Sequence, residues 1–170
     1  KDNPDVWCLP IGLMQYHTHP QPRQIVQTKN LILITYESNY GLRYIYMDGR
    51  PAPNNDPTPW WFGYSRGWFE GDTLVVETTN FSDRTNFRGS GPNLRVTERF
   101  SRVDADTLGY QLTLEDPSTW VSPWTAAYPM KPSEGPVYEY ACHEGNYGMA
   151  NLLKGARFLE KEGTAKTSLK

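Results

Sequence analysis

The run LRVTERFSRVDADTL, residues 94–108, carries the pattern from which the fold class follows. Every second residue of its first half belongs to one face: Leu94, Val96, Glu98 and Phe100. Such alternation is typical of a β-strand with one face turned inward. The turn Asp104-Ala105-Asp106 then leads into a second alternating run, so the whole stretch predicts a β-hairpin.

Glu98 is out of place on the apolar side of this strand. It is either an interior carboxylate or the sign of a β-bulge that breaks the alternation. We expect a bulge or an ion-paired structural role.

Similar short segments rich in β-branched and aromatic residues recur along the chain, each bounded by turn residues. The predicted strands are Gln24–Gln27, Leu31–Glu37, Leu42–Asp48, Tyr64–Glu70, Thr73–Phe81, Leu94–Val103, Thr107–Glu115, Thr125–Met130 and Val137–Cys142. This series predicts an all-β fold, a single antiparallel up-and-down barrel of the calycin or lipocalin kind, because closure removes exposed edges. A β-sandwich is the alternative.

Three regions follow from this pattern. Residues 1–22 contain Pro4, Pro10, Pro20 and Pro22 and predict an extended arm. Residues 23–160 form the barrel domain, which includes a short helix at Tyr147–Phe158 with apolar residues at helical spacing. Residues 161–170 are polar and predict a frayed tail.

Composition limits the class of partner. Seventeen basic and 19 acidic residues give a formal net charge of -2, and no run of Lys or Arg forms a basic stripe, so we expect no nucleic-acid partner. No window approaches the ~20 apolar residues of a membrane span. The chain begins at Lys1, and we interpret it as a soluble mature or trimmed piece.

Two cysteines, Cys8 and Cys142, lie near opposite ends of the chain. A disulfide between them would close a very long loop, which the chain-entropy model rates at no more than about 4–5 kcal/mol. The alternative is a pair of buried free thiols in a cytosolic protein. We expect the disulfide and, with it, an extracellular or periplasmic address.

A loop rich in rings and arginines is the first candidate site. Arg50 and Arg66 can hold a carboxylate or sulfate, while Trp60, Trp61 and Tyr64 offer stacking surfaces for a sugar or an aromatic ring. The alternative is a cluster that seals one end of the barrel, with arginines stacked on the rings.

The pair His143-Glu144 is the second candidate, because a histidine beside a carboxylate supplies the parts of a general acid and base. Adjacent residues on a strand face opposite sides, so the two cooperate only if the strand has ended at Cys142. Otherwise these residues form a turn whose polar groups cap the following helix.

The three histidines of the chain are the third candidate. His17 and His19 project from one face of an extended segment, and with His143 they could hold zinc or copper. The alternative is that histidines in a Pro-rich arm are solvated and that no cofactor is bound.

Four segments together resemble a large family of secreted bacterial proteins whose activity is uncharacterised. They are DGRP at 48–51, GDTLVVETTNF at 71–81, ERF at 98–100 and YEYACHEGNY at 138–147. The resemblance implies an export signal and supports the disulfide, and it brings no catalytic residue. The pair His17 and His19 departs from the family pattern.

The sequence thus supports three hypotheses. The leading one is a secreted, disulfide-tied barrel that binds a small molecule or glycan through Arg50, Trp60, Trp61, Tyr64 and Arg66. The second is a hydrolase or lyase that uses His143 and Glu144, with or without a metal. The third is a subunit of an extracellular assembly, in which the arm of one copy docks on the next.

Overall fold

The computed structural model describes residues 3–53, 58–85, 87–145 and 147–161. The chain divides into two compact units, Lys1–Tyr140 and Ala141–Lys170. The first contains the sheet, and the second contains one helix, α2 (Gly148–Lys161), as the apolar spacing predicted. Of the expected tail, residues 162–170 lie outside the described part of the chain.

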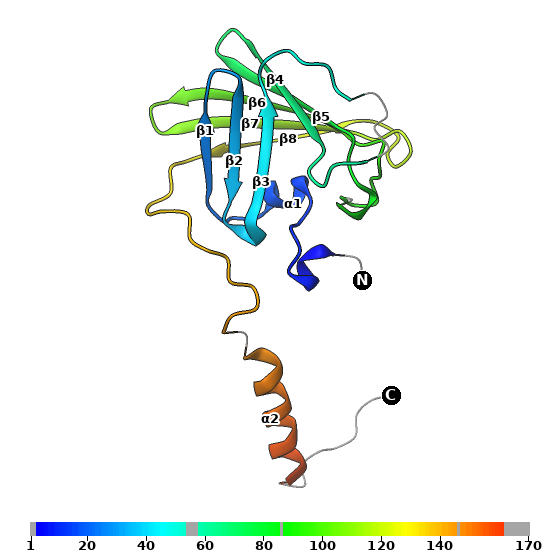
Figure 1. Cartoon of the computed structure of the whole chain (residues 1–170), viewed down its shortest axis with the longest axis vertical. Coiled ribbons are helices and arrows are strands. Elements are labelled where there is room, and N and C mark those ends of the chain that lie inside the picture. Colours follow the sequence, from blue (N-terminus) through cyan, green and yellow to red (C-terminus); the bar gives the residue numbers. More distant parts are fainter. Residues whose placement is uncertain (1–2, 54–57, 86, 146, 162–170) are drawn as a thin grey trace. The chain divides into compact units, whose positions relative to one another are not determined.

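The first unit is built on one sheet of eight strands that lie side by side in chain order (Figure 1). The strands are β1 (Arg23–Gln27), β2 (Leu31–Tyr36), β3 (Gly41–Tyr46), β4 (Tyr64–Glu70), β5 (Thr73–Thr79), β6 (Arg95–Asp104), β7 (Thr107–Glu115) and β8 (Trp124–Met130). The sheet curls into a half-barrel, and among the described residues β1 and β8 are its edge strands. The prediction of a mainly β fold is confirmed, but the structure does not confirm the closed calycin-like barrel.

One pairing departs from the expected antiparallel order. β3 and β4 run parallel, and they pair only at Ile45 with Ser65 and at Tyr46 with Arg66. The long connection from Met47 to Gly63 allows this, because it returns the chain to the starting end of the sheet before β4 begins. The short contact leaves the first half of β3 unpaired on this side, facing the residues that precede β4.

The N-terminal region is not the extended arm that its prolines predicted. It contains a short 3₁₀ helix, η1 (Pro4–Trp7), and a helix, α1 (Leu13–Thr18). The prediction was wrong because Pro10 and Pro20 flank a proline-free interval, so neither ring interrupts the helix between them. The Gln15 side chain also accepts a hydrogen bond from the Gly12 N–H at the start of α1.

Helix α1 belongs to the hydrophobic core. Ile11, Leu13, Met14 and Tyr16 are all buried in one cluster with inward-facing residues of the sheet. Tyr16 stacks on Tyr36 of β2, with 4.4 Å between ring centroids. Gly41 makes this possible, because a Cβ at this position would lie 2.5 Å from Tyr16 Cζ.

Three further segments lie between or after the strands. Two single-turn 3₁₀ helices, η2 (Ser38–Tyr40) and η3 (Asp83–Thr85), connect strands. Residues 137–142, predicted as a ninth strand, have no strand structure. That prediction was wrong because alternation within a segment does not by itself supply a neighbouring strand to pair with.

Candidate functional site

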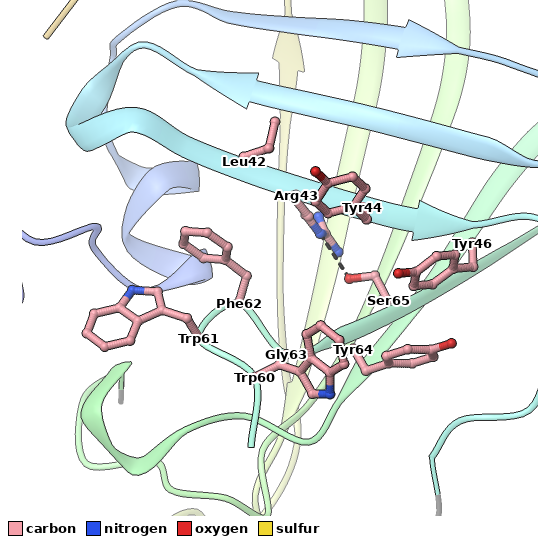
Figure 2. Close-up of a pocket in the computed structure, with 10 residues that line it drawn as sticks. All are labelled: Leu42, Arg43, Tyr44, Tyr46, Trp60, Trp61, Phe62, Gly63, Tyr64 and Ser65. Atoms are coloured by element: carbon pink, nitrogen blue, oxygen red, sulfur yellow. Dashed lines mark hydrogen bonds between the residues drawn. The ribbon is translucent and has the colours of Figure 1, made fainter. Parts of the chain in front are cut away.

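Three of the five residues predicted for the ring-rich loop line one small pocket. Trp60, Trp61 and Tyr64 surround a hollow of about 160 Å³ where β3 and β4 separate (Figure 2). The centroid of the Tyr64 ring lies 5.8 Å from that of Trp60 and 5.1 Å from that of Tyr46, so the rings pack on one another. Pockets for drug-sized ligands measure about 300–1,000 Å³, so this hollow is small for such a ligand.

The two arginines predicted for the same site have other partners. Arg50 Nη2 lies 2.6 Å from Asp48 Oδ2, and the guanidinium carbon of Arg50 lies 4.1 Å from the centroid of the Tyr46 ring. Arg66 lies 2.6 Å from Glu77. Trp61 donates its indole N–H to the Pro10 carbonyl at 2.7 Å. These contacts are typical of a cluster that closes the structure, which was the alternative interpretation of this loop.

A buried polar layer crosses the interior of the half-barrel. We use this name for His17, Tyr36, Arg43, Ser65, Thr78, Glu98 and Tyr110, all of which are buried. Arg43 donates to Glu98 through both terminal nitrogens, and also to Ser65 at 3.0 Å and to Thr78 at 2.8 Å. The Tyr110 hydroxyl donates to Glu98 Oε1 at 2.8 Å.

Glu98 is therefore an ion-paired interior carboxylate, as one of the two expectations held. The expected bulge is not at this residue; the register between β6 and β7 shifts further along, between Arg102 and Asp104. Burial acts to raise the pKa of Glu98, but Arg43, His17 and the hydrogen bonds from Arg43 and Tyr110 hold that pKa below its ordinary value. The carboxylate thus remains ionised while fully buried.

The hydrogen bonds of His17 define its tautomer. Arg23 Nη1 lies 3.1 Å from His17 Nδ1, and a guanidinium can only donate, so Nδ1 accepts. The proton is then on Nε2, which lies 3.3 Å from Glu98 Oε1. Burial, reinforced by Arg43 and Arg23 and opposed by Glu98, lowers the pKa of His17 to about 3. The ring is therefore neutral at pH 7.

The three histidines predicted as metal ligands differ in their surroundings. Both ring nitrogens of His17 already have protein partners. His19 is half-buried beside the end of α1, and His143 belongs to the second unit. Within the described ranges, no group of three or more His, Cys, Asp or Glu residues is arranged to hold a metal.

His143 and Glu144 lie in the turn before α2, and both are exposed. No strand runs up to Cys142, so the geometric objection to their cooperation does not apply. The hydrolase or lyase hypothesis stays a prediction. The disulfide is present: both cysteines are bonded, as Cys8–Cys142.

A larger pocket lies on the concave face beside α1, and we call it the α1 pocket. Its volume is about 700 Å³. It is lined by Met14, His17, Thr18, Phe87, Arg88, Leu112, Trp120, Trp124, Ala126 and Tyr128. The centroid of the Trp124 ring lies 6.0 Å from that of Trp120 and 6.2 Å from that of Phe87, so three rings meet at this pocket.

Comparison of the chain with protein-family models, curated proteins and solved structures found no match. The chemistry of this pocket therefore carries the functional argument.

Arg88 is the cation at the rim of the α1 pocket. Its guanidinium lies 5.6 Å from the Phe87 ring, and within the described part of the chain it has no ion-pair partner. A polar hollow of about 430 Å³ adjoins the pocket and shares Thr18, Phe87 and Arg88 with it. Asn3, Pro4, Gln15 and His19 line the remainder of that hollow. An apolar pocket thus opens into a polar one beside an arginine.

Sequence reasoning missed this site because its residues come from four separate segments. Met14 and His17 were assigned to an extended arm, and Trp120 and Trp124 flank a turn between two predicted strands. One signal was available: the three aromatic residues of segment 120–128 lie four residues apart, which predicts one face of a strand and the turn before it.

Proposed function

We propose that this protein binds small molecules that combine a flat aromatic body with an anionic group, such as aromatic carboxylates, in the α1 pocket. The observation that carries the proposal is the meeting of Phe87, Trp120 and Trp124 with the rim guanidinium of Arg88. The volume of about 700 Å³ lies within the range of small-molecule sites.

The physical basis is complementary surface and charge. Aromatic rings favour offset or edge-to-face contacts with another ring, worth about 0.5–1.5 kcal/mol beyond the burial of area. A guanidinium binds a carboxylate through two parallel hydrogen bonds. The adjoining polar hollow offers space in which the charged end of the ligand keeps part of its hydration, so that its desolvation is incomplete.

The α1 pocket is a better candidate than the loop that the sequence predicted. Arg50 and Arg66 are paired with Asp48 and Glu77, whereas Arg88 has no acidic partner among the described residues. The loop pocket is also less than a quarter as large, at about 160 Å³ against about 700 Å³. The variant Trp60→Ala tests whether the loop binds the ligand instead.

We further propose a secreted or periplasmic address. The Cys8–Cys142 disulfide supports it, because disulfides persist mainly in oxidising compartments. In the described ranges the structure contains no helix with the length and apolarity to span a membrane. Export to the bacterial periplasm, followed by thiol titration of the purified protein, tests this proposal.

The binding experiment uses 1-naphthoate and its neutral analogue 1-naphthalenemethanol, titrated calorimetrically into the full chain. We expect naphthoate to bind more tightly than the alcohol. Arg88→Gln should weaken naphthoate about fivefold, as for an exposed ion pair, and leave the alcohol unchanged. Arg84→Gln is the matched control, because Arg84 is exposed nearby and does not line the pocket.

A second pair of variants separates the two candidate pockets. Trp124→Ala should weaken both probes by about tenfold, because it removes a stacking ring. Trp60→Ala should leave both affinities within twofold of the parent. If Trp60→Ala weakens binding and Trp124→Ala does not, the ligand occupies the loop pocket and the proposal is wrong. Absence of binding by either probe also overturns it.

A further inference from the structure

The concave face contains a second hollow, at the opposite end from α1, and we call it the hairpin-end pocket. Its volume is about 360 Å³. It lies where the β1–β2, β4–β5 and β6–β7 hairpins turn, and it shares no lining residue with the α1 pocket. The buried polar layer lies between the two, because its strand residues share the same inward rows, and its helical member His17 lines the α1 pocket.

The apolar lining of this pocket consists of inward-facing residues. Ile25, Ile32, Leu74, Phe100 and Leu108 alternate along their strands with outward-facing neighbours. Phe69 and Ile25 belong to these inward rows and are nevertheless 52% and 43% exposed. The side chains of the described residues therefore leave this end of the interior unfilled.

The lining differs chemically from that of the α1 pocket. Most of it is aliphatic, and its two rings are phenylalanines. The polar lining residues are Gln27, Asp72 and Arg102. Arg102 donates one terminal nitrogen to the Ala105 carbonyl at 3.0 Å, which leaves the other terminal nitrogen for a ligand. Asp72 lies in the β4–β5 turn and places a negative charge at the same mouth.

We infer that the hairpin-end pocket is a second binding site, for a medium-length aliphatic chain that ends in a carboxylate. The chain replaces water against aliphatic walls, which is favourable at about 25 cal/mol per Å² of apolar surface buried. The carboxylate lies at the mouth, where Arg102 attracts it and Asp72 repels it. This site goes beyond the proposed function, because it has its own walls, its own cation and a different ligand class.

The experiment titrates decanoate and decanol calorimetrically into the full, disulfide-bonded chain. Both should bind, since the walls recognise the chain. Arg102→Gln should weaken decanoate about fivefold, and Asp72→Asn should tighten it, because one removes the attracting charge and the other the repelling one. Neither substitution should change the affinity for decanol by more than twofold.

A cavity-filling pair locates the site. Ile25→Trp should fill the pocket and weaken decanoate and decanol at least tenfold. Val26→Trp is the matched control, because Val26 is 43% exposed like Ile25 but faces the other side of the same edge strand. Phe69→Ser removes an exposed wall residue and should also weaken binding, with Trp68→Ser as its control.

Three outcomes overturn this inference, and the first two concern the binding of decanoate and decanol alone. In the first, decanoate and decanol bind to the Ile25→Trp and Phe69→Ser variants as tightly as to the matched controls. In the second, neither compound binds the parent protein. Competition provides a separate readout, because saturating 1-naphthoate should leave the decanoate affinity unchanged. If naphthoate displaces decanoate, a single site binds both ligands. The inference of a second site is then wrong, whether or not the α1 pocket binds naphthoate.

Discussion

His17 Nε2 lies 3.3 Å from Glu98 Oε1, and the two side chains are only 1% and 0% exposed. Arg23 fixes the tautomer from the other side of the ring, and Arg43 balances the charge of the carboxylate. This contact joins helix α1 to strand β6 inside the half-barrel. It couples the stability of the fold to the protonation state of one histidine.

Stability should fall as the pH falls from about 6.5 towards 3. The pKa of His17 is lowered from 6.5 to about 3 in the folded protein, so in this window the unfolded chain binds a proton that the folded chain does not. At pH 5 this difference is worth about 2 kcal/mol of the free energy of unfolding relative to pH 7. Urea unfolding at the two pH values measures it.

His17→Gln removes the titrating group and keeps an amide able to donate to Glu98. The variant should be less stable at pH 7 and should lose most of the pH dependence between pH 7 and 5. His19→Gln is the control and should retain it. Below about pH 4.5 the lowered pKa of Glu98 adds a second loss of stability. Only the change in unfolding free energy between pH 7 and 5 therefore reports on His17 alone. An unchanged slope in His17→Gln would contradict this account.

Breaking the Arg43–Glu98 pair should cost about 3–5 kcal/mol of unfolding free energy, because the remaining charge is buried without its partner. Arg43→Met and Glu98→Gln test the two halves of the pair. The double variant should cost less than the sum of the two single variants. Arg99→Gln, which breaks the exposed pair with Glu70, is the control and should change stability little.

Reduction of the Cys8–Cys142 disulfide should lower the unfolding temperature. The bridge closes almost the whole first unit, and the chain-entropy model sets an upper limit of about 4–5 kcal/mol. Cys8→Ser, Cys142→Ser and the double variant should be destabilised alike, and dithiothreitol should not change them further. A parent protein that unfolds at the same temperature with and without dithiothreitol would refute a stabilising role.

Gly41→Ala should destabilise the fold by about 1–3 kcal/mol, because the new methyl group overlaps the Tyr16 ring at 2.5 Å. Tyr16→Leu in the same chain should recover part of the loss, since the overlap is then removed. Gly155→Ala is the control: its Cβ meets nothing within 4 Å, and alanine favours the helix. Thermal unfolding of the parent, the single variants Gly41→Ala and Tyr16→Leu, and the double variant measures the coupling, with Gly155→Ala as the control.

Local pattern was sufficient for most of the sheet. All eight observed strands begin within one residue of the position that alternation and turn residues predicted. Helix α2 followed from apolar spacing in the same way. Alternation and turn chemistry act over a few residues, so the sequence displays them directly.

Contacts between distant segments were beyond such reasoning. Arg43 and Glu98 are 55 residues apart, and no local pattern pairs them. The same holds for His17, whose ring nitrogens have partners from β1, β2 and β6. The prolines around α1 predicted an extended arm. So short a helix is stabilised by burial against the sheet, and this burial exists only in the folded chain, so the local sequence did not indicate it.

The alternation of residues 94–108 was enough to establish strand, turn and the odd position of Glu98, because these depend on neighbours in the chain. The charge state of Glu98, the tautomer of His17 and the two hollows on either side of the buried polar layer arose only when the sheet curled around α1. The reason is physical: burial, ion pairing and cavity shape are set by groups that approach in space, and a linear pattern does not specify which groups these are.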